Sequence, residues 1–172
     1  MHLAHHYYHF RDYDRAIAHL RSVLELEPTF LFAHGLLAMA LLARGGRDPS
    51  DVQKSKYAEA LAEAQAAAGI GQDRPAMVAI LGYAYGMSGN MREAQEVLTQ
   101  LTELSKRRYV SPYDLAIVHV GLGDKDQAVK ELRRAYEERS PHLVLLKAEP
   151  VFDSLRSDPR FAQVLKDMKL PP

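Results

Sequence analysis

Histidines near the start of the chain are the residues whose spacing could most directly do chemistry. His2, His5 and His9 recur at intervals of three and four residues. On a helix these intervals place the three imidazoles on one face, where they could ligate a transition metal ion. The segment holds no cysteine or carboxylate to complete a ligand set, so a polar patch that lines a groove is the alternative interpretation.

The rest of the sequence lacks the usual signatures of catalysis. It contains no Walker loop, dinucleotide-binding fingerprint, nucleophile elbow or HExxH pair. The absence of cysteine excludes disulfides, zinc knuckles, iron–sulfur clusters and cysteine nucleophiles. We therefore expect no enzymatic activity and no cofactor. Acidic pairs do occur, but at places where helix caps or solvated helix faces would put them: Asp12 with Asp14, Glu25 with Glu27, and Glu137 with Glu138.

The charge balance limits the kinds of partner. The 172 residues include 22 basic and 22 acidic side chains, a formal net charge of zero, whereas a dedicated nucleic-acid surface normally leaves a basic excess. The longest apolar run, 31–43, is interrupted by His34 and is too short to cross a bilayer. The first residues lack the charged and apolar regions of a signal peptide. We expect a cytoplasmic protein without a nucleic-acid or membrane partner.

An internal repeat supplies the helices that would position these residues. Four segments, 3–7, 37–41, 81–85 and 115–119, each begin with Leu followed by Ala or Gly. In three of the segments, a second Ala stands twelve positions after this Ala or Gly. In the segment that begins at 37, the corresponding Ala comes a further ten positions along the chain. Antiparallel helices that cross closely need small side chains at the contact. The pattern offers eight such positions: Ala4, Ala16, Ala38, Ala60, Gly82, Ala94, Ala116 and Ala128.

Each repeat is expected to contain two helices joined by a short polar turn. Apolar residues recur at helical spacing through 13–24 and 94–104. A glycine in the left-handed conformation can end the first helix, and the candidates are Gly45, Gly89 and Gly123. An Asp or Asn can then cap the second helix, and the candidates are Asp12, Asn90 and Asp124.

The repeats resemble the tetratricopeptide repeat (TPR), a 34-residue helix–turn–helix unit with a Leu-Gly-x-x-Tyr signature. Residues 81–85, Leu-Gly-Tyr-Ala-Tyr, carry that signature. The resemblance implies an all-α fold, namely a right-handed superhelix of antiparallel helix pairs closed by a C-terminal helical cap. The expected parts are four TPR-like repeats and the capping helices, at 1–30, 31–74, 75–108, 109–142 and 143–172.

The second repeat carries an insertion of ten residues near 46–55. Ser50 followed by Gln53 matches a capping box, so the second helix of this repeat should begin near Asp51 and end near Ala68. We interpret the insertion as a tolerated surface extension, and a specificity loop is the alternative.

The last thirty residues contain three prolines at the starts of expected helices. Pro141, Pro150 and Pro159 each follow a capping residue or a helix end, which predicts three short helices. The segment resembles the end-of-group segment that closes TPR arrays in many bacterial proteins, through Glu-Pro-Val-Phe-Asp at 149–153 and Asp-Pro-Arg-Phe at 158–161. A cap of this kind covers the apolar flank of the last repeat. The covering residues that we expect are Leu143, Val144, Leu145, Phe152, Leu155, Phe161 and Leu165.

In TPR proteins the first helix of each repeat lines the concave surface on which partner peptides lie. Some of these proteins hold a peptide carboxylate there with Lys, Arg and Asn, but this chain lacks those residue types at the matching positions. The resemblance thus implies a protein–protein interaction scaffold that binds a partner peptide or helix, or another copy of itself. Its groove would be largely apolar, with Phe32, Leu36, Met39, Ile80, Tyr83, Tyr113 and Asp114 as binding residues.

Three other interpretations stay open. A short superhelix could curl so tightly that the groove residues pack on one another. Arrays of this type often follow another domain, so the chain could be the regulatory C-terminal part of a larger bacterial signalling protein, such as a kinase, a cyclase or a transcription regulator. The histidines could instead make it a metal- or small-ligand-binding helical protein.

Overall fold

The computed structural model describes residues 2–45 and 51–169, and within 51–56 it describes only the backbone. The described residues form helices and no strand. The first part comprises four helix pairs: α1 (His2–His9) with α2 (Tyr13–Leu26), α3 (Leu31–Gly45) with α4 (Asp51–Ile70), α5 (Pro75–Met87) with α6 (Met91–Ser105), and α7 (Pro112–Leu122) with α8 (Lys125–Glu137). The tail follows as two 3₁₀ helices and an α-helix: η1 (Pro141–Leu145), η2 (Pro150–Leu155) and α9 (Pro159–Asp167).

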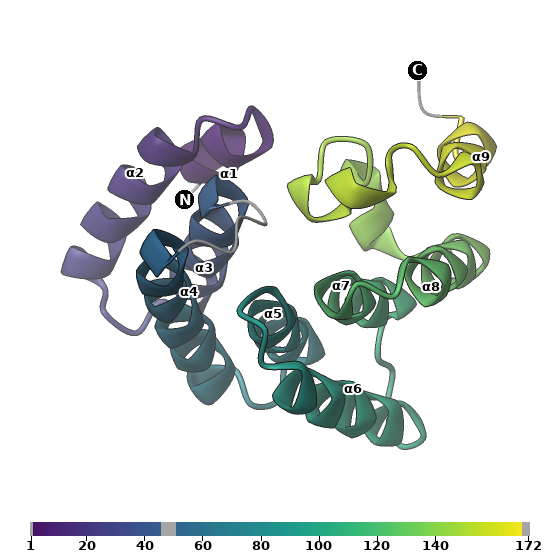
Figure 1. Cartoon of the computed structure of the whole chain (residues 1–172), viewed down its shortest axis with the longest axis horizontal. Coiled ribbons are helices and arrows are strands. Elements are labelled where there is room, and N and C mark those ends of the chain that lie inside the picture. Colours follow the sequence, from purple (N-terminus) through teal and green to yellow (C-terminus); the bar gives the residue numbers. More distant parts are fainter. Residues whose placement is uncertain (1, 46–50, 170–172) are drawn as a thin grey trace.

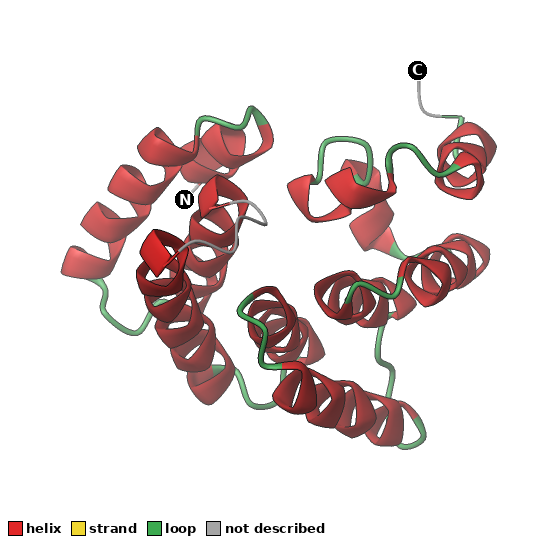
Figure 2. Ribbon diagram, viewed as in Figure 1, coloured by secondary structure: helices red, strands yellow, loops and turns green. Residues whose placement is uncertain are grey.

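The helix pairs follow one another around a curved path, with α3, α5 and α7 toward its inside (Figure 1). Each of these helices packs against the second helix of its own pair, and α5 also packs against both α3 and α7. Short loops join the helices (Figure 2). The all-α solenoid predicted from the sequence is therefore confirmed.

The eight small residues of the repeat lie where helices touch. The seven alanines are 0% exposed and Gly82 is also buried. A Cβ atom at Gly82 would lie only 2.7 Å from Cγ1 of Val97, on the second helix of the same pair. The expected reason for these small residues, close crossing of paired helices, is thus confirmed.

A second close approach joins neighbouring pairs and has no counterpart in the repeat alignment. A Cβ atom at Gly86, on α5, would lie 2.4 Å from the carbonyl carbon of Gly121, on α7. A Cβ atom at Gly121 would lie 2.9 Å from Cα of Tyr83. The backbones of α5 and α7 are therefore in direct contact, which only glycine permits at these two positions.

The turns within the pairs follow the expected chemistry at most positions. Gly89 and Gly123 have positive φ angles of 83° and 77°, and the side chains of Asp12 and Asp124 accept hydrogen bonds from backbone N–H groups of α2 and α8. The prediction is wrong for Asn90, whose side chain makes no capping hydrogen bond.

Much of the insertion near 46–55 lies outside the described residues. Gly45 is the last residue of α3, and α4 runs from Asp51 to Ile70, close to the bounds expected for this helix. The proposed capping box begins at Ser50, which lies in the segment that is not described.

The three short helices predicted for the tail are present, and each has a proline in its first turn. Most of the expected covering residues are buried or half-buried, but Val144 and Leu145 are 73% and 43% exposed. The prediction is wrong for these two because η1 is a 3₁₀ helix with three residues per turn. Leu143 and Leu146 therefore share its inner side, where both are buried.

The tail does more than cover the last repeat. Helix α9 packs on α8, as expected for a cap, but η2 packs on α7 and α3. The fully buried ring of Phe152 lies 5.3 Å from that of Tyr113 on α7 and 6.3 Å from that of Phe161 on α9. The tail thus occupies part of the inside of the curve.

Candidate functional site

A cavity of about 180 Å³ lies between the inner helices and the tail. We call it the central cavity. It is lined by residues of α1, α3, α5, α7 and the tail, and six of the seven predicted groove residues are among them. The lining residues are His5, Tyr8, Phe32, Leu36, Met39, Ala76, Met77, Ile80, Tyr113, Asp114, Ile117, His142 and Glu149.

Tyr83 is the groove residue that the structure places elsewhere. It lines a separate space of about 370 Å³, together with residues of α2, α3 and η2. The cause is the close contact of α7 with α5, because Gly121 lies against the backbone and ring of Tyr83. Tyr83 is only 5% exposed as a result.

One wall of the central cavity is apolar and comes from α3 and α5. Leu36 and Met39 are each 7% exposed, and Ile80 is half-buried. Gly35 allows α3 to approach α5, because a Cβ atom there would lie 3.2 Å from both Cδ1 of Ile80 and Sδ of Met77. Phe32 stands at the rim, 42% exposed. This wall can receive an alkyl or aromatic side chain.

Another part of the lining is polar and joins α1 to the tail. Tyr8, fully buried on α1, donates a hydrogen bond of 2.5 Å to Oε1 of Glu149, in the loop between η1 and η2. The backbone N–H of Val151 donates a second one to the same oxygen, at 3.4 Å. Burial and the neighbouring carboxylate raise the pKa of Tyr8 well above its ordinary value. Sequence reasoning placed neither Tyr8 nor Glu149 at the site.

His9 adds a third contact to this carboxylate. Its Nδ1 bonds to the backbone carbonyl of His5 at 2.8 Å, and its Nε2 lies 3.4 Å from Oε2 of Glu149. Interaction with Glu149 raises the pKa of His9, so the imidazole is stabilised in its protonated form. Tyr8 and His9 together fix Glu149 against α1.

Asp114 is the second carboxylate of the central cavity, and its surroundings differ. The side chain is 6% exposed and accepts no hydrogen bond from any described residue. Its only ion-pair partner in the described part of the chain is His142, whose Nδ1 lies 3.7 Å from Oδ1, which is longer than a hydrogen bond. The Asp114 carboxylate raises the pKa of His142.

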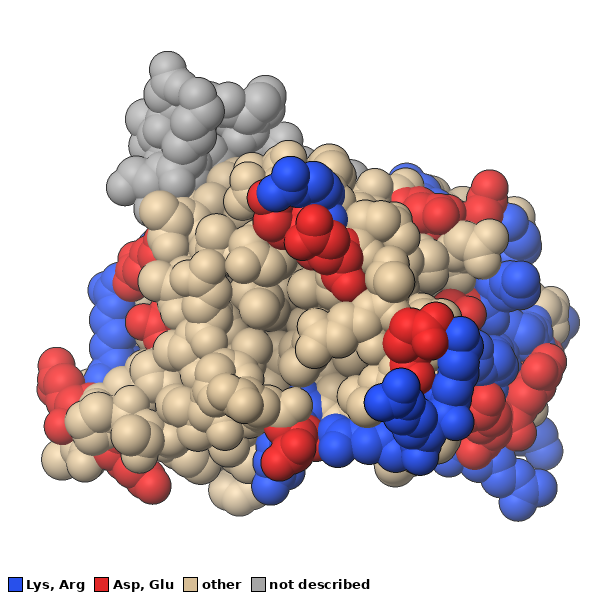
Figure 3. Space-filling view, turned by 90° about the horizontal axis from the view of Figure 1, so that it is seen from below, with Lys and Arg blue, Asp and Glu red and all other residues tan. Residues whose placement is uncertain are grey.

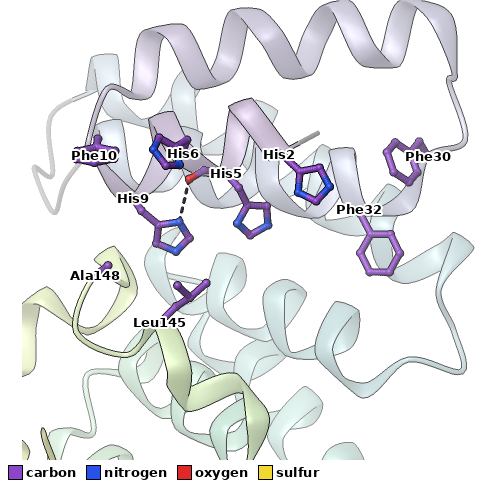
Figure 4. A pocket seen from close by; sticks show the side chains of 9 residues that line it. All are labelled: His2, His5, His6, His9, Phe10, Phe30, Phe32, Leu145 and Ala148. Atoms are coloured by element: carbon purple, nitrogen blue, oxygen red, sulfur yellow. Dashed lines mark hydrogen bonds between the residues drawn. The ribbon is translucent and has the colours of Figure 1, made fainter. Parts of the chain in front are cut away.

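The N-terminal histidines line a wider space beside the central cavity. This histidine cleft has a volume of about 610 Å³ and is lined by His2, His5, His6, His9, Phe10, Phe30, Phe32, Leu145 and Ala148. Figure 4 shows His2, His5 and His9 in a row along the side of α1 that faces Leu145. The central cavity and the histidine cleft share the lining residues His5 and Phe32, so the two spaces are adjacent.

The histidine row has the predicted shared face but little to offer a metal ion. The rings of His5 and His9 stack at 5.4 Å, and burial lowers the pKa of His5. Among the side chains that the structure describes, those of residues 2–45 and 57–169, no group of three or more His, Asp or Glu is arranged to hold a metal ion.

Charged side chains are unevenly distributed over one face of the molecule. Figure 3 shows a broad uncharged area, hollowed near its middle, with Lys, Arg, Asp and Glu side chains gathered mainly on the side of α6 to α9. In the part of the chain that the structure describes, no helix combines the length and apolar character needed to cross a membrane.

Comparison with protein-family models and with curated proteins gives no match to this chain.

Proposed function

We propose that this chain is a non-enzymatic, TPR-type interaction module that binds a segment of a partner protein on the inside of its curve. The main support is that Phe32, Leu36, Met39, Ile80, Tyr113 and Asp114, from three helices, line one cavity. The lack of cysteine favours a cytoplasmic setting for this interaction.

The dimensions favour a peptide segment over a large compact ligand. The central cavity, at about 180 Å³, holds little more than one side chain, whereas the adjoining histidine cleft has about 610 Å³ and aromatic walls. A partner segment can therefore seat one anchor side chain in the central cavity and continue along the cleft. Anchoring through one or a few buried side chains is the common mode of peptide recognition.

A selection from a random displayed-peptide library tests this proposal. Peptides enriched on the unmodified chain are titrated against it and against an Ile80→Glu variant. Ile80 is half-buried in the cavity wall, and a carboxylate there would meet apolar side chains, so affinity should fall at least about tenfold, or about 1.4 kcal/mol.

Ile70→Glu is the matched control, because Ile70 is 45% exposed at the end of α4 and does not line the central cavity. It should bind the peptides as the unmodified chain does, and all three proteins should give the same circular dichroism. Peptides that bind the Ile80→Glu variant undiminished would remove the central cavity from the proposed binding site.

A further inference from the structure

Asp114 is a buried charge whose partners are incomplete. Its side chain is 6% exposed, yet no hydrogen bond reaches its carboxylate from the described residues, and His142 stays 3.7 Å away. A carboxylate that is largely buried is costly unless hydrogen bonds or a close paired charge satisfy it. His142 is a poor charge partner for Asp114, because its own side chain is 46% exposed and therefore solvated.

Glu149 shows what a satisfied carboxylate looks like in the same cavity. It receives hydrogen bonds from Tyr8 and from the backbone N–H of Val151, and His9 lies at 3.4 Å. The contacts with Tyr8 and His9 tie the tail to α1, which gives Glu149 a structural role. Asp114 makes no comparable connection, although it sits on the first turn of α7 and lines the same cavity.

Apart from His142, the ion-pair partner of Asp114, the described lining residues next to Asp114 supply mainly alkyl contacts. Met39, Ile80 and Ile117 stand with Asp114 around a space of about 180 Å³, and none of the described lining residues is Lys or Arg. A ligand group that fits must be apolar along its length and positively charged at its tip. A lysine side chain has this form, with four methylene groups and a compact ammonium.

We propose that the anchor of the bound partner segment is a lysine, with its ammonium paired to Asp114 and its alkyl stem against Met39, Ile80 and Ile117. Arginine fits less well, because its planar guanidinium carries five donors, and Asp114 is the one carboxylate among the described cavity residues that accepts no hydrogen bond from them. This inference rests on the proposed function and specifies the partner that the same site selects.

Two small probes test the lysine anchor on the full chain. Nα-acetyl-lysine methylamide carries the ammonium, and Nα-acetyl-norleucine methylamide is a similar alkyl chain without it. Both are titrated into protein with labelled methionine methyl groups. Signals of Met39 and Met77, which line the cavity, should shift, while that of Met91, on α6 outside the cavity, should not.

The lysine probe should bind at least about tenfold more tightly than the norleucine probe. Asp114→Asn should remove this difference, because it keeps the shape of the side chain and removes its charge. Asp73→Asn is the matched control, since Asp73 is fully exposed and lies outside the cavity. It should keep the difference, and neither variant should melt below the temperature of the unmodified chain.

Equal affinity of the two probes for the unmodified chain would overturn the lysine anchor, whatever the folding of the variants. Tighter binding of the corresponding arginine probe would overturn it as well. Peptides that bind through Ile80 but carry no lysine would refute this inference while leaving the proposed function in place. Loss of the Ile80 dependence would instead refute the proposed function.

Discussion

At the scale of single residues, the Tyr8–Glu149 hydrogen bond is the contact with the clearest energetic consequence. Tyr8→Phe removes the hydroxyl and leaves a buried carboxylate without its shortest hydrogen bond, 2.5 Å in length. Hydrogen bonds to charged groups contribute about 1.5–3 kcal/mol. We expect the free energy of unfolding to fall by that amount in urea denaturation.

Tyr7→Phe is the control for this prediction. Tyr7 is half-buried on the same helix, and its hydroxyl makes no hydrogen bond with any described residue. Phenylalanine keeps the ring, over which Arg15 lies at 5.8 Å, so the loss should stay within about 0.5 kcal/mol. Equal losses for the two variants would show that the Tyr8 hydroxyl contributes nothing specific.

At the scale of helices, the contact between α5 and α7 depends on two residues without side chains. Gly86→Ala places a Cβ atom 2.4 Å from the backbone of Gly121, and neither backbone can move without disturbing its neighbours. Overpacking of this kind costs about 3 kcal/mol. We expect a corresponding fall in the free energy of unfolding, measured by chemical denaturation.

Gly69→Ala makes the same change where there is room. Gly69 lies near the end of α4, and a Cβ atom there would meet nothing within 4 Å. Alanine favours a helix over glycine by about 1 kcal/mol, so this variant should be as stable as the unmodified chain or more stable. A similar loss in both variants would point to the glycine backbone and not to the helix contact.

The helices and their pairing could be predicted from the sequence because their signals are local. Leu-Ala or Leu-Gly steps, turn residues and prolines recur at fixed spacing, and the structure has helices where they predict them. The α5–α7 contact was missed because Gly86 and Gly121 stand outside the repeat alignment. A glycine inside a helix costs stability unless a close contact requires it. The presence of Gly86 and Gly121 within expected helices could therefore have indicated that these two helices touch.

At the scale of the whole molecule, the tail joins the ends of the solenoid. Tyr8 and Glu149 are 141 positions apart in the chain, and the ion pair of Arg11 with Asp153 makes a second link of 2.8 Å. No local sequence pattern predicts a contact between residues so far apart in the chain. The groove residues could therefore be predicted from the repeat, but the polar wall that completes the central cavity could not.

This contact between the two ends changes how the molecule should respond to a destabilising substitution. In an open solenoid each repeat contacts only its neighbours, so a destabilising substitution at one end leaves the other end folded. Here one buried cluster includes Tyr8 of α1, Tyr113 of α7 and Phe152 of η2, whereas Leu101 of α6 belongs to a separate cluster. The first cluster should lose its stability as a unit.

Phe152→Ala tests this coupling between the ends. Removing a fully buried phenyl ring costs about 3 kcal/mol or more, which should speed hydrogen exchange roughly a hundredfold in α1 as well as in α7. Leu101→Ala, at an equally buried site, should speed exchange in α5, α6 and α7, whose residues form its cluster, and leave α1 protected. Unchanged protection of α1 in Phe152→Ala would mean that the tail and α1 unfold independently, and that the central cavity can open without loss of the repeats.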